Sequence, residues 1–152
     1  MTIIVPEGTR TLIPQTHSGI DPRLCGRPVV LDPGAARVEL ETVPEMAADE
    51  TGLVHGGFVF GLADYAAMLA VNHPNVVLGS AQTRFLKPVV VGERLVADAS
   101  LLEEEGRKRR VAVEVRRADQ VGEMGELVMT GELLCFVPDR HVLAGPVREG
   151  GS

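Results

Sequence analysis

The longest apolar stretch of the chain, residues 56–71, holds a single charged side chain, Asp64. Apolar residues occupy almost the whole circumference of a helix drawn on this stretch, which is typical of a buried central helix. Its early glycines lower the intrinsic helix propensity, and glycine is tolerated where another backbone or a ligand comes close. Pro74 ends the segment, because proline disfavours helical geometry in the residue before it. The pattern predicts a helix from Gly56 to Asn72.

Polar and apolar residues alternate in several other segments, as expected for strands with one buried face. One such segment precedes the predicted helix and four follow it, joined by hairpin-like turns: 37–43, then 76–87, 94–102, 110–117 and 126–137. Their outer positions mix polar and apolar residues, which is compatible with a dimer. The order predicts an α+β fold in which an antiparallel sheet curls around one long central helix.

The two ends of the chain are richer in proline and glycine than its middle. We expect residues 1–36 to form an irregular arm with short extended pieces, such as Val29-Val30-Leu31. Residues 37–138 are expected to form the folded domain, and residues 139–152 a loose tail. A chain of 152 residues fits one domain well and two poorly.

Charge and cysteine content exclude some classes of protein. Fifteen basic against 21 acidic residues argue against a general nucleic-acid binder. Cys25 and Cys135 match no metal or redox spacing and are expected to be free thiols in a reducing compartment. Met1–Pro6 lacks the basic start and apolar core of a signal peptide, and the apolar stretch is too short for a membrane span of roughly 20 residues. A cytoplasmic protein without metal or prosthetic group is therefore expected.

His55-Gly56-Gly57 stands where a loop becomes the predicted helix. The first N–H groups of a helix lack internal partners and lie at the positive end of its dipole, so they can bind an oxygen that becomes anionic during a reaction. Asp64 lies two turns further, about 10 Å along the axis from Gly57, which is too far for both to act on one carbonyl. Two antiparallel helices related by a two-fold axis would bring Gly57 of one chain opposite Asp64 of the other. The spacing therefore favours a composite site in a homodimer.

These residues resemble the hotdog-fold thioesterases, in the branch related to phenylacetate-pathway and 4-hydroxybenzoyl-CoA thioesterases. The resemblance covers roughly residues 37–137 and rests on four motifs: His55-Gly56-Gly57, Leu62-Ala63-Asp64, Phe85-Leu86-Lys87-Pro88 and Gly92-Glu93. It implies the same helix-in-sheet fold and an acyl-CoA substrate, with CoA entering only as part of that substrate.

The resemblance also implies roles for individual residues. The backbone N–H of Gly56 or Gly57 polarises the thioester carbonyl, and Asp64 of the opposite subunit attacks it or activates water. His55 orients the loop or contacts the thioester. Relatives often place an asparagine six residues before the histidine to position water or the leaving thiol, whereas this chain has Asp49.

Other candidate substrate contacts lie on the strand after the helix. Gln82 and Arg84 share one face, and in the family this strand lines the dimer seam and the substrate channel. Arg84 suits either a CoA contact or an ion pair. Phe85, with Phe58, Phe60 and Met68, suits either an aromatic or an aliphatic acyl pocket. The basic run Arg107–Arg110 faces Glu103–Glu105 across a turn, where cross-strand charge pairing explains it better than phosphate binding does.

Structural and functional alternatives remain at this point. Asp64 could be a buried carboxylate satisfied by a hydroxyl or an arginine, and His55 a structural loop residue. A related hydratase or dehydratase acting on acyl thioesters, or a non-catalytic acyl-CoA-binding protein, would use the same fold. Whether dimers pair further into tetramers is also open.

Overall fold

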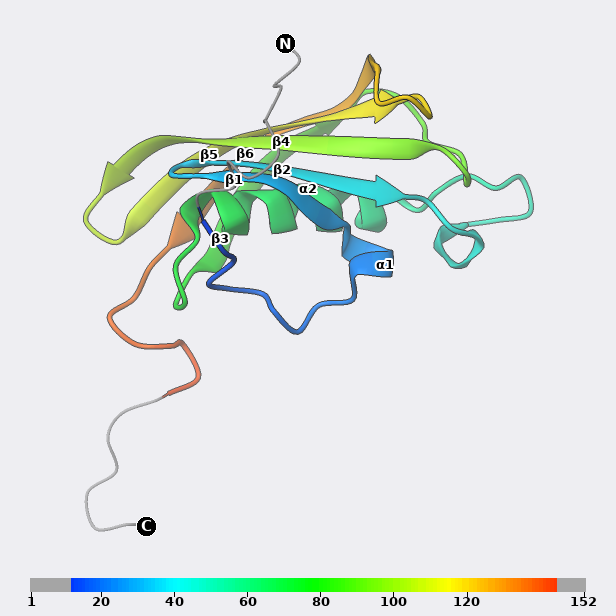
Figure 1. Cartoon of the computed structure of the whole chain (residues 1–152). Coiled ribbons are helices and arrows are strands. Elements are labelled where there is room, and N and C mark those ends of the chain that lie inside the picture. Colours follow the sequence, from blue (N-terminus) through cyan, green and yellow to red (C-terminus); the bar gives the residue numbers. More distant parts are fainter. Residues whose placement is uncertain (1–11, 145–152) are drawn as a thin grey trace, which may run out of the picture.

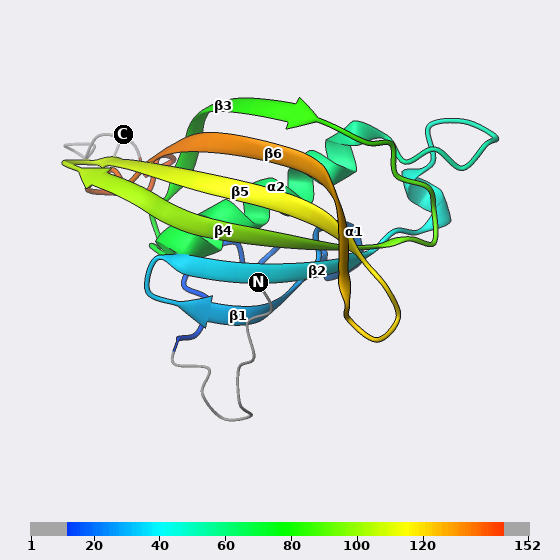
Figure 2. The same cartoon turned by 90° about the horizontal axis from the view of Figure 1, so that it is seen from above.

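The computed structural model describes residues 12–144 and shows a single antiparallel sheet with a long helix across one face (Figures 1 and 2). The predicted α+β architecture is confirmed. Its elements are α1 (Pro22–Cys25), β1 (Arg27–Asp32), β2 (Ala35–Glu41), a 3₁₀ turn (Pro44–Met46), α2 (Gly56–Val71), β3 (Val77–Phe85), β4 (Arg94–Glu105), β5 (Lys108–Ala118) and β6 (Met124–Phe136).

The six strands lie in the order β1-β2-β4-β5-β6-β3, and every neighbouring pair is antiparallel. The expectation that β3 and β4 are joined by a hairpin-like turn is wrong, because β3 pairs with β6 at the far edge of the sheet. Residues 86–93 make this crossing, and the N–H groups of Leu86 and Lys87 both donate to the Val128 carbonyl, at 2.8 and 3.3 Å. Pro88, which cannot donate to a ladder, follows directly.

The core lies between α2 and the sheet strands β2, β4 and β5. The alternation of polar and apolar residues sets which side chains enter it. One face of β4 and β5 is almost fully buried, through Leu95, Ala97, Ala99, Val111, Val113 and Val115. Alanines at several buried positions of α2 leave little side-chain bulk between the helix and the sheet.

The helix α2 begins at Gly56 as predicted and ends at Val71, one residue before the predicted end. Asn72 caps its C-terminus in the left-handed conformation, with φ 51° and ψ 51°, and its N–H donates to the Met68 carbonyl at 2.8 Å. The Asn72 amide also accepts from the Gln15 N–H at 2.7 Å and donates to the Ile13 carbonyl at 3.1 Å. The segment before β1 is thus tied to the helix end, and it runs along the side of α2 away from the sheet (Figure 1).

The sheet starts ten residues before the expected domain boundary at residue 37. β1 pairs with β2 through a tight turn at Gly34, which has φ 75°. The expected extended piece Val29-Val30-Leu31 is confirmed as the centre of β1, in which Pro28 and a register shift interrupt the alternation. Residues 139–144 form bends and turns after β6, while residues 1–11 of the arm and 145–152 of the tail lie outside the described residues. None of the helices within residues 12–144 is long and apolar enough to cross a bilayer.

Candidate active site

The N-terminus of α2 is open to a ligand. His55 is the N-cap residue, with extended backbone geometry and no side-chain capping bond. Its ring lies close over Gly57, since a Cβ built there would be 3.0 Å from His55 Nε2, and its edge meets Phe58 with ring centroids 6.1 Å apart. Any side chain at position 57 would displace the imidazole. The glycine therefore lets the histidine ring and the first helical N–H groups share one small region.

A pocket of about 250 Å³ adjoins this helix start. Gly56 and Val59 form one side, and the end of β3 with residues 86–89 forms the other. The Phe85 ring lies against Gly56, with Cε1 3.6 Å from where a Cβ would stand. Phe85 is thereby placed at the helix N-terminus, beside the amides that could hold a carbonyl oxygen.

Asp64 lies half-buried in the middle of α2. Its Oδ1 atom is buried and has no hydrogen-bond partner among the described residues. Burial raises the pKa of Asp64 to about 6. The interpretation of Asp64 as a carboxylate satisfied by a nearby hydroxyl or arginine therefore fails for Oδ1 within residues 12–144. A carboxyl group that titrates near pH 6 is well suited to accept a proton at neutral pH.

Asp64 opens into a second pocket, of about 470 Å³. The polar wall comes from residues 15–18, in the segment that crosses beneath α2, and from His141. No pattern in the sequence indicates this wall, because it depends on how the arm folds back along the helix. Within it, His17 has a positive φ of 57°, its Nδ1 lies 2.7 Å from the Thr16 hydroxyl oxygen, and burial lowers its pKa.

The two halves of the predicted site do not meet within one chain. Gly56 lines the first pocket and Asp64 the second, and no residue lines both. This agrees with the separation of about 10 Å that a straight helix imposes between positions 57 and 64.

The other predicted substrate contacts lie elsewhere. Asp49 is exposed, and its Oδ1 accepts from the N–H and the hydroxyl of Thr51 at 2.9 and 2.5 Å, which lowers its pKa. Gln82 and Arg84 are exposed on β3 and line a separate pocket of about 520 Å³ with Glu132. That pocket lies on the sheet face opposite α2, so within one chain only Phe85 of the β3 candidates reaches the helix start. Their roles in substrate binding stay predictions.

The basic run after β4 is used in ion pairs. Arg110 pairs with Glu103 at 2.6 Å and also with Glu132, and Arg109 pairs with Glu104 at 2.7 Å. The cross-strand explanation of this cluster is confirmed.

Within residues 12–144 there is no cluster of three or more histidine, cysteine or acidic side chains that could hold a metal ion. Both cysteines are free, and burial raises the pKa of the Cys135 thiol to about 12. Cys135 is therefore protonated at neutral pH and unsuited to act as a nucleophile.

Comparison with known proteins identifies the family. The Thioesterase superfamily model matches residues 51–123, which contain both α2 and the β3–β4 crossing. The crystal structure of the uncharacterized protein PH1136 from Pyrococcus horikoshii superposes with a TM-score of 0.80 at 52% identity, over 87% of this chain and 99% of that one. A mutant of the phenylacetic acid degradation protein PaaI from Thermus thermophilus superposes with a TM-score of 0.66 at 30% identity, over 76% and 95%.

Curated relatives share only part of their length with this chain. A protein named methylthioribose-1-phosphate isomerase, from Aquifex aeolicus, is 54% identical over 100 residues, which are 66% of this chain and 22% of that protein. The transcription factor FapR of Caldanaerobacter subterraneus is 27% identical over 89 residues, which are 59% of this chain and 44% of that protein. The helix-on-sheet fold, the family match and the solved structures together lead to one conclusion: the chain belongs to the hotdog-fold thioesterase superfamily.

Proposed function

We propose that this protein hydrolyses acyl-CoA thioesters as a homodimer, with each site built from the α2 N-terminus of one protomer and Asp64 of the other. The observation that carries the proposal is the carboxyl group of Asp64, which is partly buried, has no hydrogen-bond partner on Oδ1 within residues 12–144 and has a pKa raised to about 6. A protein that used Asp64 only for stability would gain from pairing it.

The edge strand β3 supports the dimer. Among the described strands it pairs with β6 on one side only, so its other edge carries backbone groups that a second β3 can pair with. Antiparallel pairing of two β3 strands across a two-fold axis would continue the sheet and set the two α2 helices antiparallel. In that arrangement Gly57 of one protomer would face Asp64 of the other, whereas the two residues are too far apart within one chain. It also brings Gln82, Arg84 and Phe85 to the seam.

The chemistry follows from these positions. The thioester carbonyl oxygen accepts hydrogen bonds from the N–H groups of Gly56 and Gly57, which stabilise the negative charge that develops on it. Asp64 takes a proton from water as the water oxygen bonds to the carbonyl carbon. The carbon–sulfur bond then breaks, and the leaving thiolate receives that proton from Asp64. Direct attack by Asp64 on the carbonyl is the alternative. His55 orients the loop before Gly56, and CoA enters only with the substrate.

The test is loss of thiol release in two variants. Asp64→Asn and Asp64→Ala should lower kcat by at least about 100-fold on a panel of acyl-CoAs followed with a thiol reagent. Light scattering should show the same assembly as for the unchanged protein. Asp98→Asn, on a β4 carboxylate paired with Arg37 at 2.7 Å, is a matched control that should retain activity. Turnover at the original rate in both Asp64 variants would refute the mechanism.

Mixing variants tests whether the site is shared between chains. Gly57→Val and Asp64→Ala should each be inactive alone. After exchange of subunits, a mixed dimer with a shared site contains one centre with both residues intact and one with neither. We expect activity to reappear on mixing, whereas a site confined to one chain would give none.

A second candidate function is acyl-CoA binding without turnover. The similarity to FapR, which is named a transcription factor, favours it, although the two chains match over 89 residues only. Tight binding of an acyl-CoA that remains intact for hours would support this candidate against hydrolysis.

A further inference from the structure

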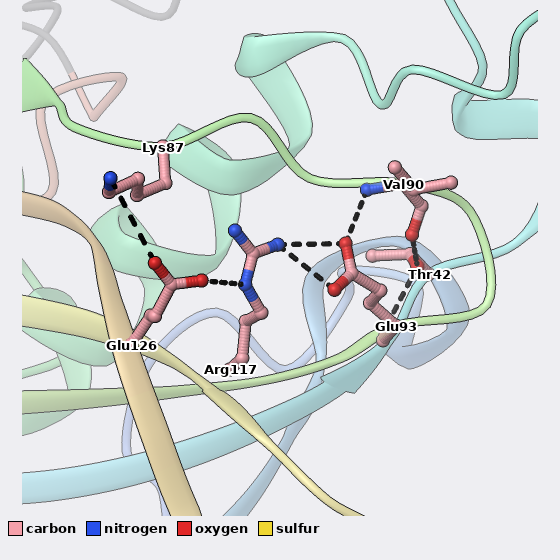
Figure 3. A network of polar contacts seen from close by, with 6 residues as sticks. All are labelled: Thr42, Lys87, Val90, Glu93, Arg117 and Glu126. Carbon is pink, nitrogen blue, oxygen red and sulfur yellow. Dashed lines mark hydrogen bonds and ion pairs between the residues drawn. The ribbon is translucent and has the colours of Figure 1, made fainter.

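A polar network lies beside the crossing that joins β3 to β4 (Figure 3). At its centre, Arg117 Nη1 donates to both carboxylate oxygens of Glu93, at 2.8 and 2.9 Å. Arg117 Nε donates to Glu126 at 3.1 Å, and Lys87 lies 4.0 Å from the other oxygen of Glu126. Both Glu93 and Arg117 are largely shielded from solvent, with side chains 33% and 21% exposed. Water therefore screens this pair less than it screens the exposed pairs of the sheet.

Glu93 also holds the backbone of the crossing. Its Oε1 accepts from the Val90 N–H at 2.6 Å, and its own N–H donates to the Val90 carbonyl at 3.1 Å. The Thr42 hydroxyl donates to the carbonyls of Glu93 and Val90 at 2.7 and 3.2 Å, as Figure 3 shows. Three hydrogen bonds therefore hold the Val90 backbone, one from its N–H and two to its carbonyl oxygen.

Residues 89–91 in turn hold the entry to α2. The Val54 N–H donates to the Val89 carbonyl at 2.8 Å, and the Val91 N–H donates to the Gly52 carbonyl at 2.8 Å. Leu53 and Val90 form an isolated antiparallel bridge between the two segments. Val54 stands two residues before Gly56. Hydrogen bonds and the backbone of residues 89–91 thus link Arg117 to Val54, two residues before the start of α2.

We propose that the Glu93–Arg117 ion pair is a positioning element of the active site, because it fixes residues 88–91 and, through them, the direction of the Gly56 and Gly57 N–H groups. The inference rests on the proposed function for its effect on turnover. Neither side chain touches the substrate. Displacing oxyanion donors by a fraction of an ångström weakens transition-state stabilisation more than it weakens ground-state binding.

The matched comparison is with Arg37–Asp98. That pair also has two charge-assisted hydrogen bonds, at 2.7 and 3.1 Å, and is also partly buried, but it joins β2 to β4 and makes no hydrogen bond to residues 86–93 or 52–57. If both pairs only stabilise the fold, breaking either pair should have the same effect on kcat. If Glu93–Arg117 positions the helix start, breaking it should lower kcat more than breaking Arg37–Asp98.

The experiment compares Glu93→Gln and Arg117→Met with Asp98→Asn in the full chain. We expect the first two to lower kcat about 10- to 100-fold with KM changed less than about threefold, and Asp98→Asn to change kcat less than about twofold. Arg117→Lys, which keeps the charge but not the fork, should fall between Arg117→Met and the unchanged protein.

Hydrogen exchange separates this inference from the proposed function. The amides of residues 52–58 should exchange faster in Glu93→Gln and Arg117→Met than in Asp98→Asn, whether or not the protein hydrolyses any acyl-CoA. Faster exchange in a protein without turnover would retain the positioning role and refute hydrolysis. Equal exchange and equal kcat in Glu93→Gln and Asp98→Asn would overturn the positioning role.

Discussion

Replacing Asp64 by asparagine should make the protein more stable at neutral pH. The Oδ1 atom of Asp64 is buried without a hydrogen-bond partner in the described part of the chain, and burial raises the pKa of Asp64, so the folded chain disfavours the charged form of this side chain. Asparagine has nearly the same shape and carries no charge at any pH. Asp64→Asn therefore removes the electrostatic cost while leaving the packing of α2 almost unchanged.

The size and the pH range of the effect follow from linkage. With a pKa near 3.8 in the unfolded chain and about 6 in the folded one, the folded chain binds more protons between these values. The contribution of Asp64 to the free energy of unfolding is thus most favourable below about pH 4. It falls as pH rises from about 4 to 6 and is fully lost above about pH 6. At 1.36 kcal/mol per pH unit the loss is about 3 kcal/mol. Because Asp64 is only partly buried, solvent screening reduces the expected loss to about 2 kcal/mol.

The assay is urea unfolding of both proteins at pH values from 4 to 8. The chain has no tryptophan and one tyrosine, so far-ultraviolet circular dichroism is the suitable signal. Protomer concentration must be the same throughout, since the stability of an oligomer depends on it. The free energy of unfolding of Asp64→Asn, minus that of the unchanged protein, should increase by about 2 kcal/mol between pH 4 and pH 7.

Asp49→Asn is a control with the opposite sign. Hydrogen bonds from Thr51 lower the pKa of Asp49, so its ionised form stabilises the folded chain and the variant should lose stability relative to the unchanged protein as pH rises. A stability difference for Asp64→Asn that stays flat between pH 4 and pH 7 would show that the Asp64 carboxyl group is not desolvated, and the reasoning on its pKa would be refuted.

Two further results are expected. The kcat/KM for thioester hydrolysis should rise about tenfold per pH unit below pH 6 and level off above it, and a profile without a bend near the pKa of Asp64 would contradict its role as base. Gly26→Ala should cost about 3 kcal/mol in urea unfolding, because φ is 101° and the new Cβ would stand 2.7 Å from both Glu39 O and Val38 Cγ1. Gly19→Ala, with nothing within 4 Å, should cost far less, and equal losses would contradict the steric argument.

Local sequence patterns predicted the strands that bury one face and the helix whose residues are almost all apolar. Ala97 and Ala99 alternate with Asp98 and Ser100 because one face of β4 covers the core and the other does not. Within α2, residues 65–70 are apolar on every side because all of them are buried. Only the centre of β1, Val29-Val30-Leu31, was expected to be extended, since Pro28 and a register shift break the alternation of the strand. The pairing of β3 with β6 was not predictable from these patterns, because alternation says which face is buried and nothing about which strand lies alongside.

The residues of the candidate site likewise divide into those that local sequence patterns predict and those that meet only in the tertiary structure. The spacing of Gly57 and Asp64 within one helix is a local property, so their separation could be worked out from the sequence. The wall of the Asp64 pocket formed by Thr16 and His17 forms only because the segment before β1 folds back along α2. Likewise Glu93 stood in a recognisable motif, but its partner Arg117 is 24 residues away and meets it only after β4 and β5 have paired.

The position of β3 has a consequence for how the chain folds. β3 is synthesised before β4 and β5, yet its only strand partner in the described chain is β6, with Val77 opposite Phe136. The nearest pair of that ladder, Phe85 with Met129, is 44 residues apart, so β3 cannot join the sheet until β6 has been made. Until then it presents two unpaired edges next to a highly apolar helix. The period in which β6 is incomplete or detached is therefore the one in which this protein is most exposed to aggregation.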